Sequence, residues 1–275
     1  GEFRTGAMPD RNTEYLYYQT LIGAWPLPVD RAQAYMLKAT REAKQQTSWV
    51  ANSQEFESAL HSFIERTLAH APFLRDVQQF VDRVKDAGRV NSLAQTLMKC
   101  TAPGVPDLYQ GTELWDLSLV DPDNRRPVDY GERRRLLKEL MAMQGDDVAA
   151  QVMARADDGL PKMWTIHQAL QLRRERPEWF GAENGYTPLR VDGGKRDHVI
   201  AYLRGDTVVT VVPRLNMKLL GTWRDTVVLL PEGRWRNRLT GAVMDGGRTA
   251  VRGLLKNFPV ALLVQENGSE GRSDA

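Results

Sequence analysis

The sequence predicts an α+β fold in which a helical part precedes a compact antiparallel β part, with the division near residue 180. In residues 12–100, apolar side chains recur at the three- and four-residue spacing of helices. After Glu178 apolar and polar side chains alternate, which is typical of strands. Between these regions, residues 105–109 are the one segment of the first part with strand character.

The first hundred residues are expected to contain four or five helices. The first has Asn12 as its N-cap and stops at the proline-rich stretch 25–28, because proline removes a backbone donor. The second runs from Val29 to about residue 46, and a loop follows to residue 52. Ser53 caps the third helix, Pro72 begins the fourth, and Gly88 is expected to end it before a further helix.

The rest of the chain is expected to begin with helices and to continue with strands. The helices cover residues 131–143 and lie within residues 148–176, where Pro177 ends them. The strands are parted by turns rich in glycine, aspartate and proline. They are residues 186–191, 197–203, 207–212, 226–230, 234–237, 249–254 and 259–264.

The composition limits the classes of protein to which this chain can belong. The 275 residues are 42% hydrophobic and 26% charged, with a formal charge of +2, so neither nucleic acid nor anionic lipid is an expected partner. Cys100 is the only cysteine, which excludes an intrachain disulfide and suits the cytoplasm. The apolar runs are too short for a membrane span, which needs about 20 residues. Residues 1–7 are expected to be an expression-tag remnant outside the fold, and residues 268–275 a disordered tail.

The densest cluster of chemistry-bearing residues lies in residues 103–129. Tyr109, Gln110, Glu113 and Trp115 stand at and just beyond the carboxyl end of the predicted strand. Sugars stack their C–H faces on aromatic rings and need amides and carboxylates for their hydroxyls, so this combination indicates a carbohydrate cleft. We expect Trp115 to line the cleft, so that its replacement by alanine changes product formation without unfolding the protein.

A second set follows in Asp121, Asp123, Asn124 and Arg125. On spacing alone, the favoured interpretation is a turn with surface ion pairs. A metal site is disfavoured, because the segment lacks the glycine and the distant glutamate of a calcium loop. No metal is therefore assigned to this segment.

Residues 101–129 closely resemble the eighth strand and following loop of the maltooligosyltrehalose synthase family, in the alpha-amylase clan (glycoside hydrolase family 13). The resemblance rests on the motifs PGVPD, QGTE and LVDPDNRRPVD, and upstream on NTEYL, YQTL, GAWP, KATREAK and TSW. It covers nearly the whole chain after residue 7. Ala51 stands where that family usually has proline, and Phe56 where it has tyrosine.

The resemblance implies a fold and its boundaries. Residues 8–100 are expected to be a helical insertion, and residues 101–180 the last strand of a (β/α)8 barrel with its cleft loop and helices. Residues 181–267 are expected to be a C-terminal antiparallel β-sandwich. The barrel strands that carry the family's three catalytic carboxylates precede this sequence. The missing N-terminal barrel portion is thus an expected partner, this chain supplies no catalytic residue, and the chain alone should be inactive.

The resemblance also implies a reaction and a substrate. The whole enzyme is expected to convert the terminal α-1,4 linkage of maltooligosaccharides into an α,α-1,1 linkage by intramolecular transglycosylation. Substrate-binding residues are then Tyr109, Gln110, Glu113, Trp115, Asp121, Asp123, Asn124 and Arg125. Lys44, Thr47, Ser48 and Trp49 form a further candidate cluster, which is equally typical of a helix C-terminus with a partly buried tryptophan. A noncatalytic α-glucan-binding module and a purely structural fragment are the alternatives.

Overall fold

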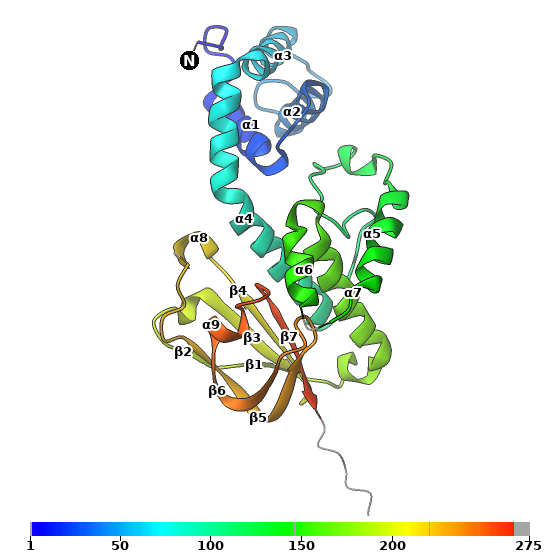
Figure 1. Cartoon of the computed structure of the whole chain (residues 1–275). Helices are drawn as coiled ribbons and strands as arrows, with labels where there is room; N and C mark the ends of the chain where they lie inside the picture. The colour runs from blue at the N-terminus through cyan, green and yellow to red at the C-terminus, as the bar shows by residue number, and fades with distance from the viewer. Residues whose placement is uncertain (1, 146, 220, 267–275) are drawn as a thin grey trace, which may run out of the picture. The chain divides into compact units, whose positions relative to one another are not determined.

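The computed structural model describes residues 2–145, 147–219 and 221–266 (Figure 1). The chain forms two compact units. The helical unit consists of residues 1–86 and 117–127, and the mixed unit of residues 87–116 and 128–275. Helix α4 (Ala71–Thr101) contributes residues to both. Residues 100 and 180, the predicted domain boundaries, both lie within the mixed unit, and the finer domain division stays a prediction.

The helical unit is built from α1 (Arg11–Ala24), α2 (Val29–Ala43), α3 (Gln54–Ala69) and the first part of α4. Its core contains Tyr17, Leu21, Met36 and Phe63, which are almost completely buried. The Tyr17 hydroxyl lies 2.7 Å from the Thr67 hydroxyl, so this buried polar group has a hydrogen-bond partner inside the core. The predicted helical spacing is therefore confirmed in this region.

Helix ends differ from the prediction by a few residues. Asp10, not Asn12, caps α1, because its carboxylate accepts hydrogen bonds from the backbone N–H groups of Asn12 and Thr13. Ser53 caps α3 as predicted and accepts from the Phe56 N–H. Helix α2 stops at Ala43, earlier than expected, since Lys44 adopts the left-handed conformation.

The predicted end of the fourth helix at Gly88 is wrong. Helix α4 runs through Gly88 without a break and is 31 residues long in total. A glycine inside a helix costs only about 1 kcal/mol relative to alanine. Tertiary packing outweighs that cost, because Leu93 and Leu97 on the following turns are almost fully buried in the core of the mixed unit.

The predicted strand at residues 105–109 is also not formed. The segment is irregular, and no strand among the described residues pairs with it. A strand needs a neighbour for its backbone groups, and the helices on either side offer none. Arg173 holds the preceding turn instead, donating to the carbonyls of Cys100 and Gly104 at 3.1 and 3.2 Å.

Helices α5 (Tyr130–Ala142), α6 (Val148–Ala154) and α7 (Leu160–Glu175) complete the helical layer of the mixed unit. Asp129 caps α5 by accepting from the Glu132 N–H at 2.9 Å. Helix α7 ends just before Pro177, as predicted. Leu136, Leu160 and Leu172 project into the core that these helices share with α4.

The C-terminal strands form one antiparallel sheet with the order β1-β3-β4-β7-β5-β2, and β6 pairs with β5. Helices α8 (Asn216–Leu219) and α9 (Val251–Leu254) lie in its connections. The strands are β1 (Tyr186–Pro188), β2 (Val191–Asp192), β3 (Val199–Arg204), β4 (Val208–Pro213), β5 (Val227–Asn237), β6 (Val243–Ala250) and β7 (Ala261–Glu266).

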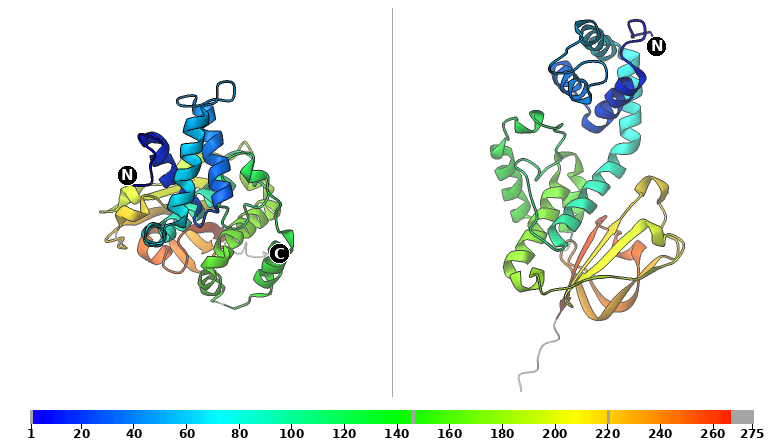
Figure 2. Two further views of the ribbon diagram at one scale, coloured as in Figure 1. Left: turned by 90° about the horizontal axis from the view of Figure 1, so that it is seen from above. Right: turned by 180° about the vertical axis from the view of Figure 1, so that it is seen from behind.

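Both faces of the central strands are buried, which explains the continuous apolar run in β4. Val208 and Val212 face the helical core, whereas Val209 and Val211 face a second core around Trp235 and α9. Figure 2 shows the C-terminal part of α4 beside this sheet. The predicted antiparallel β part is thus confirmed, with the described strands hydrogen-bonded into a single sheet. The finer β-sandwich arrangement stays a prediction.

Three further expectations are corrected here. The predicted strands 226–230 and 234–237 are one strand, β5, with an irregularity between Leu230 and Arg234. The predicted strand 249–254 is the end of β6 followed by α9. Residues 2–7 are not outside the fold, since Phe3 packs against the core of the helical unit. The predicted disordered tail, 268–275, lies outside the described residues.

Candidate functional site

The first predicted segment, residues 109–115, lies in the mixed unit. Tyr109 and Gln110 are exposed at its start. The Thr112 hydroxyl donates to the Tyr109 carbonyl at 2.6 Å and closes a turn at this point. Gly111 follows in a left-handed conformation and is buried against Val128. The turn therefore presents the Tyr109 and Gln110 side chains to solvent.

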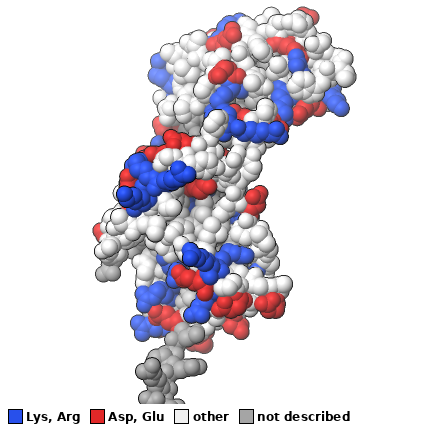
Figure 3. Space-filling view, turned by 90° about the vertical axis from the view of Figure 1, so that its right-hand side faces the viewer, with Lys and Arg blue, Asp and Glu red and all other residues white. Residues whose placement is uncertain are grey.

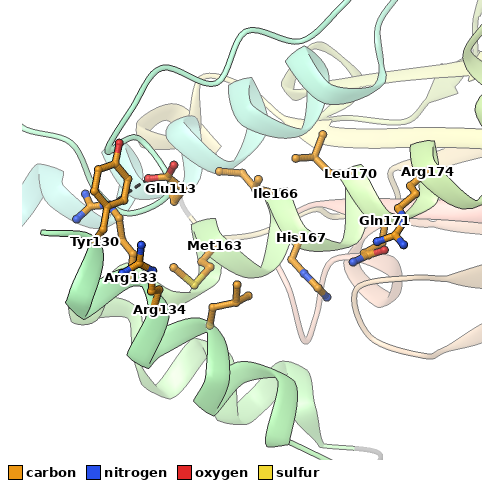
Figure 4. A pocket seen from close by; sticks show the side chains of 11 residues that line it. Glu113, Tyr130, Arg133, Arg134, Met163, Ile166, His167, Leu170, Gln171 and Arg174 are labelled. Carbon is orange, nitrogen blue, oxygen red and sulfur yellow. Dashed lines mark hydrogen bonds and ion pairs between the residues drawn. The ribbon is translucent and has the colours of Figure 1, made fainter. Parts of the chain in front are cut away.

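Glu113 is an ion-pair partner. Its carboxylate accepts from Arg133 Nε at 3.0 Å, and the same guanidinium donates to the Gly111 carbonyl through Nη2 at 2.5 Å. Glu113 borders a groove of about 360 Å³ between α5 and α7 (Figure 4). Leu137, Met163, Ile166 and Leu170 contribute apolar surface to this groove. None of the other predicted site residues borders it among the described residues.

Trp115 is a packing residue of the mixed unit. Its indole N–H donates to the Ala156 carbonyl at 2.6 Å, and its ring packs against the helical core. Lys162 donates to the adjacent Leu114 carbonyl at 3.0 Å, and burial lowers the pKa of this lysine. Trp115→Ala is therefore expected to lower the stability of the chain, because the substitution removes both a hydrogen bond and buried ring surface. The expected place of Trp115 in the cleft stays a prediction.

Asp123 is the most constrained residue of the 121–125 set, which lies in the helical unit. Arg31 of α2 donates to its two carboxylate oxygens from Nε at 2.9 Å and from Nη2 at 2.8 Å. The Leu119 N–H donates to the same carboxylate at 2.7 Å. The Arg31 hydrogen bonds lower the pKa of Asp123. Arg31 was not among the residues predicted from the sequence.

The other members of that set are less constrained. Asp121 and Arg125 form an ion pair of 2.5 Å in which both side chains are largely exposed. Asn124 is partly buried, and its Oδ1 has no hydrogen-bond partner within the described residues. The set thus combines one anchored carboxylate with an exposed ion pair and a partly buried amide whose oxygen is shielded from solvent.

The second predicted cluster, residues 44–49, follows α2 in the helical unit. Thr47 is buried, and its hydroxyl donates to Glu57 at 2.6 Å and accepts from the Ser53 N–H at 3.0 Å. Trp49 is 59% exposed, and its ring lies 4.9 Å from the guanidinium of Arg41. Lys44 is exposed at the end of the helix.

Glu57 is a functional candidate that the sequence reasoning missed. Arg41 donates to its two oxygens at 2.9 and 2.7 Å. The signal in the sequence was a carboxylate between the buried residues Phe56 and Leu60 on α3. A buried carboxylate requires a partner, and the Arg41 guanidinium supplies one.

Acid is expected to remove the stabilisation that Glu57 provides. The Arg41 hydrogen bonds hold the pKa of Glu57 at about 2. A carboxyl with a lowered pKa stabilises the fold fully above its unfolded pKa of about 4.3, and this contribution is lost as the pH falls towards 2. Urea unfolding at about pH 6 and about pH 3 should therefore show a larger loss of stability for the unmodified chain than for Glu57→Gln. Equal losses in the two proteins would contradict this account.

The structure does not bring all twelve predicted residues into one unit. Tyr109, Gln110, Glu113 and Trp115 belong to the mixed unit. The remaining eight belong to the helical unit, where α2 carries both the partner of Asp123 and the partner of Trp49. Helix α2 therefore links the two candidate segments of that unit.

Other features that could indicate a function are metal-binding groups, membrane-spanning helices and a surface with charges of one sign. No group of three or more histidine, cysteine, aspartate or glutamate side chains is placed to hold a metal ion there. None of the described helices is long and apolar enough to cross a membrane. On the face shown in Figure 3, basic and acidic side chains are interspersed.

No family model matches the chain. The similar proteins and structures nevertheless carry the same enzyme name. A protein of Mycobacterium tuberculosis named maltooligosyl trehalose synthase is 38% identical over 94% of the chain. The structure of maltooligosyltrehalose synthase from Arthrobacter ramosus matches 95% of the chain with a TM-score of 0.84 and 38% identity. A crystal structure of a maltooligosyl trehalose synthase matches 93% with a TM-score of 0.75 and 27% identity.

These matches cover only part of each relative. The chain spans 32% of the Mycobacterium tuberculosis protein and 34% of the Arthrobacter ramosus chain. It therefore corresponds to about a third of the length of the relatives.

Proposed function

Since the chain is homologous to the C-terminal third of maltooligosyltrehalose synthases, we propose that it is the substrate-binding C-terminal part of such an enzyme. The observation that carries the proposal is the match of 38% identity and TM-score 0.84 over 95% of the chain. Two of the motifs that indicated the family, LVDPDNRRPVD and TSW, lie in the loop that Arg31 anchors and in the turn that follows α2.

The proposed reaction of the whole protein is an isomerisation. The α-1,4 bond between the reducing-end glucose and the rest of a maltooligosaccharide breaks, and the donor anomeric carbon is held on an enzyme carboxylate. The released glucose then attacks that carbon through its own anomeric hydroxyl, forms the α,α-1,1 bond and frees the carboxylate. No water is consumed, so water must be excluded until the glucose has attacked.

The catalytic carboxylates are proposed to lie in the two thirds of the enzyme that this chain does not include. The carboxylates in this chain have other partners: Glu113 pairs with Arg133, Asp123 with Arg31 and Glu57 with Arg41. A nucleophile must reach the anomeric carbon, and a general acid must reach the leaving glycosidic oxygen. In the whole enzyme, residues 105–109 are proposed to become the last barrel strand, with the preceding part of the protein supplying their neighbours.

The proposed ligand-binding groups are the predicted residues that remain accessible. They are Tyr109, Gln110, Asp121, Asn124, Arg125, Lys44, Ser48 and Trp49. Rings, amides and charged groups together suit a neutral polyhydroxyl ligand. Neither metal nor organic cofactor takes part in the proposed reaction, and the proposed location is the cytoplasm.

The whole protein is expected to convert maltohexaose into a product of unchanged mass whose reducing end is blocked as a trehalose unit. Chromatography with a reducing-sugar assay follows this conversion directly. Free glucose is expected only as a minor product of hydrolysis. If the whole protein released glucose or maltose without any nonreducing product, the proposed isomerisation would be wrong.

A further inference from the structure

The turn that follows α2 holds an aromatic side chain outside the core. Trp49 is 59% exposed and its neighbour Val50 is 97% exposed. The turn is closed by two hydrogen bonds, from the Ser48 N–H to the Ala51 carbonyl at 3.1 Å and from the Ala51 N–H to the Ser48 hydroxyl at 3.0 Å. The exposed ring therefore stands on an ordered turn.

A cation covers one face of this ring. The Arg41 guanidinium carbon lies 4.9 Å from the centre of the Trp49 ring. Such a contact fixes the ring plane and leaves the opposite face for another group. Arginine is suited to this because its planar guanidinium stacks on an aromatic face while its N–H groups bind a carboxylate.

Arg41 is in turn held in place by Glu57. Glu57 binds its guanidinium with two hydrogen bonds of 2.9 and 2.7 Å, and the Glu57 side chain is only 10% exposed. Thr47 donates a third hydrogen bond to the same carboxylate. This chain of contacts connects the buried interior of the helical unit to the exposed ring, so its members act as one network.

We propose that Trp49 is a stacking platform for a glucose ring of an α-glucan, and that Arg41 and Glu57 are positioning residues that hold the indole plane. The inference rests on the proposed function, because it assigns one binding position to the same substrate. A ring that is already ordered loses little side-chain freedom when a ligand binds. This reduces the entropic cost of binding a sugar.

Calorimetric titration of the 275-residue chain with maltohexaose tests the platform. Trp49→Ala is expected to weaken binding about tenfold, whereas Trp49→Phe keeps a ring and should stay within about threefold of the unmodified chain. Trp49 is largely exposed, so neither substitution should change the melting temperature appreciably. Trp179→Ala serves as the control, because Trp179 has a similar arginine contact, with Arg176 at 5.3 Å, in the mixed unit.

A double-mutant cycle tests the positioning residues. Glu57→Gln and Arg41→Lys should each weaken maltohexaose binding about threefold when Trp49 is present and have no effect on it when Trp49 is alanine. A merely structural role would lower affinity by the same factor in both backgrounds. Arg41→Lys keeps the charge near Glu57, so it remains informative if Glu57→Gln does not fold.

Two results would overturn the inference: unchanged affinity in Trp49→Ala, or no binding of maltohexaose by the unmodified chain. Unchanged affinity together with Trp49-dependent self-association would assign the ring to a protein contact instead. Unchanged affinity in Trp49→Ala, with binding by the unmodified chain intact, would overturn the platform alone, whereas absence of binding would also remove the proposed substrate-binding role of the chain. The proposed isomerisation is tested separately, by the products that the whole protein forms.

Discussion

Replacing Asp123 by alanine is expected to lower the free energy of unfolding of the chain by about 2–3 kcal/mol. The substitution removes three hydrogen bonds to one carboxylate and leaves Arg31, whose side chain is only 17% exposed, without that partner. It also weakens the attachment of residues 117–127 to α2, where the hydrogen bond from Arg31 to the Leu117 carbonyl at 3.1 Å remains. Urea unfolding of the chain measures the stability, and in the whole protein we expect the rate of trehalose-end formation to fall at least about tenfold.

Asp121→Ala is the matched control for this prediction. Asp121 lies on the same loop, but its ion pair with Arg125 is exposed on both sides. Exposed pairs typically contribute less than about 1 kcal/mol. If Asp121→Ala and Asp123→Ala destabilised the chain equally, the anchoring role of Arg31 would be refuted.

Replacing Trp235 by alanine is expected to lower the free energy of unfolding by about 3–5 kcal/mol, the largest stability effect in the chain. Trp235 is completely buried in the core between the curved sheet and α9, and its indole N–H donates to the Pro231 carbonyl at 2.9 Å. Removing the ring leaves a cavity and an unsatisfied carbonyl. Thermal and urea unfolding followed by circular dichroism measure the loss.

Val243→Ala is the control in the same sheet, because Val243 on β6 is 37% exposed and should contribute less than about 1 kcal/mol. At a temperature where Trp235→Ala is still folded, its affinity for maltohexaose should match that of the unmodified chain, since Trp49 lies in the other unit. A stability loss below about 1 kcal/mol in Trp235→Ala would contradict the assignment of this core.

The helices were predictable because each buries one face of a periodic pattern. Asp10 shows the limit of such patterns, since Asp10 and Asn12, two positions apart, are both residue types that cap helices, and only the backbone geometry selects one. Gly88 shows a second limit, because a helix-weakening residue is tolerated when long-range packing supplies the energy. Neither the packing partners nor their contribution can be read from local sequence.

The strands were predictable by region and less so by pairing. The long strand β5 contains Pro231 and Gly233, which locally indicate a turn, yet β6 and β7 supply neighbours that hold the strand across this irregularity. Residues 105–109 show the reverse case, since a strand-like sequence without a neighbour remains irregular. Strand formation depends on partners that lie far away in sequence.

The sequence motifs of the candidate site were predictable, but the side-chain contacts between distant residues were not. The pair Arg31–Asp123 joins residues 92 positions apart, and no spacing rule relates them. Glu57 was missed because charged residues in a first helical turn are usually exposed. Trp115 was assigned to the cleft because it follows a polar motif, whereas the structure ties its N–H to Ala156.

We propose that this chain binds the α-glucan and that the remaining two thirds of the enzyme performs the chemistry. The most direct test is to incubate the purified 275-residue chain with maltohexaose, titrating binding by calorimetry and analysing the same solution for products. We predict saturable binding with maltohexaose recovered unchanged. Formation of trehalose-ended product or glucose by the chain alone would contradict the claim.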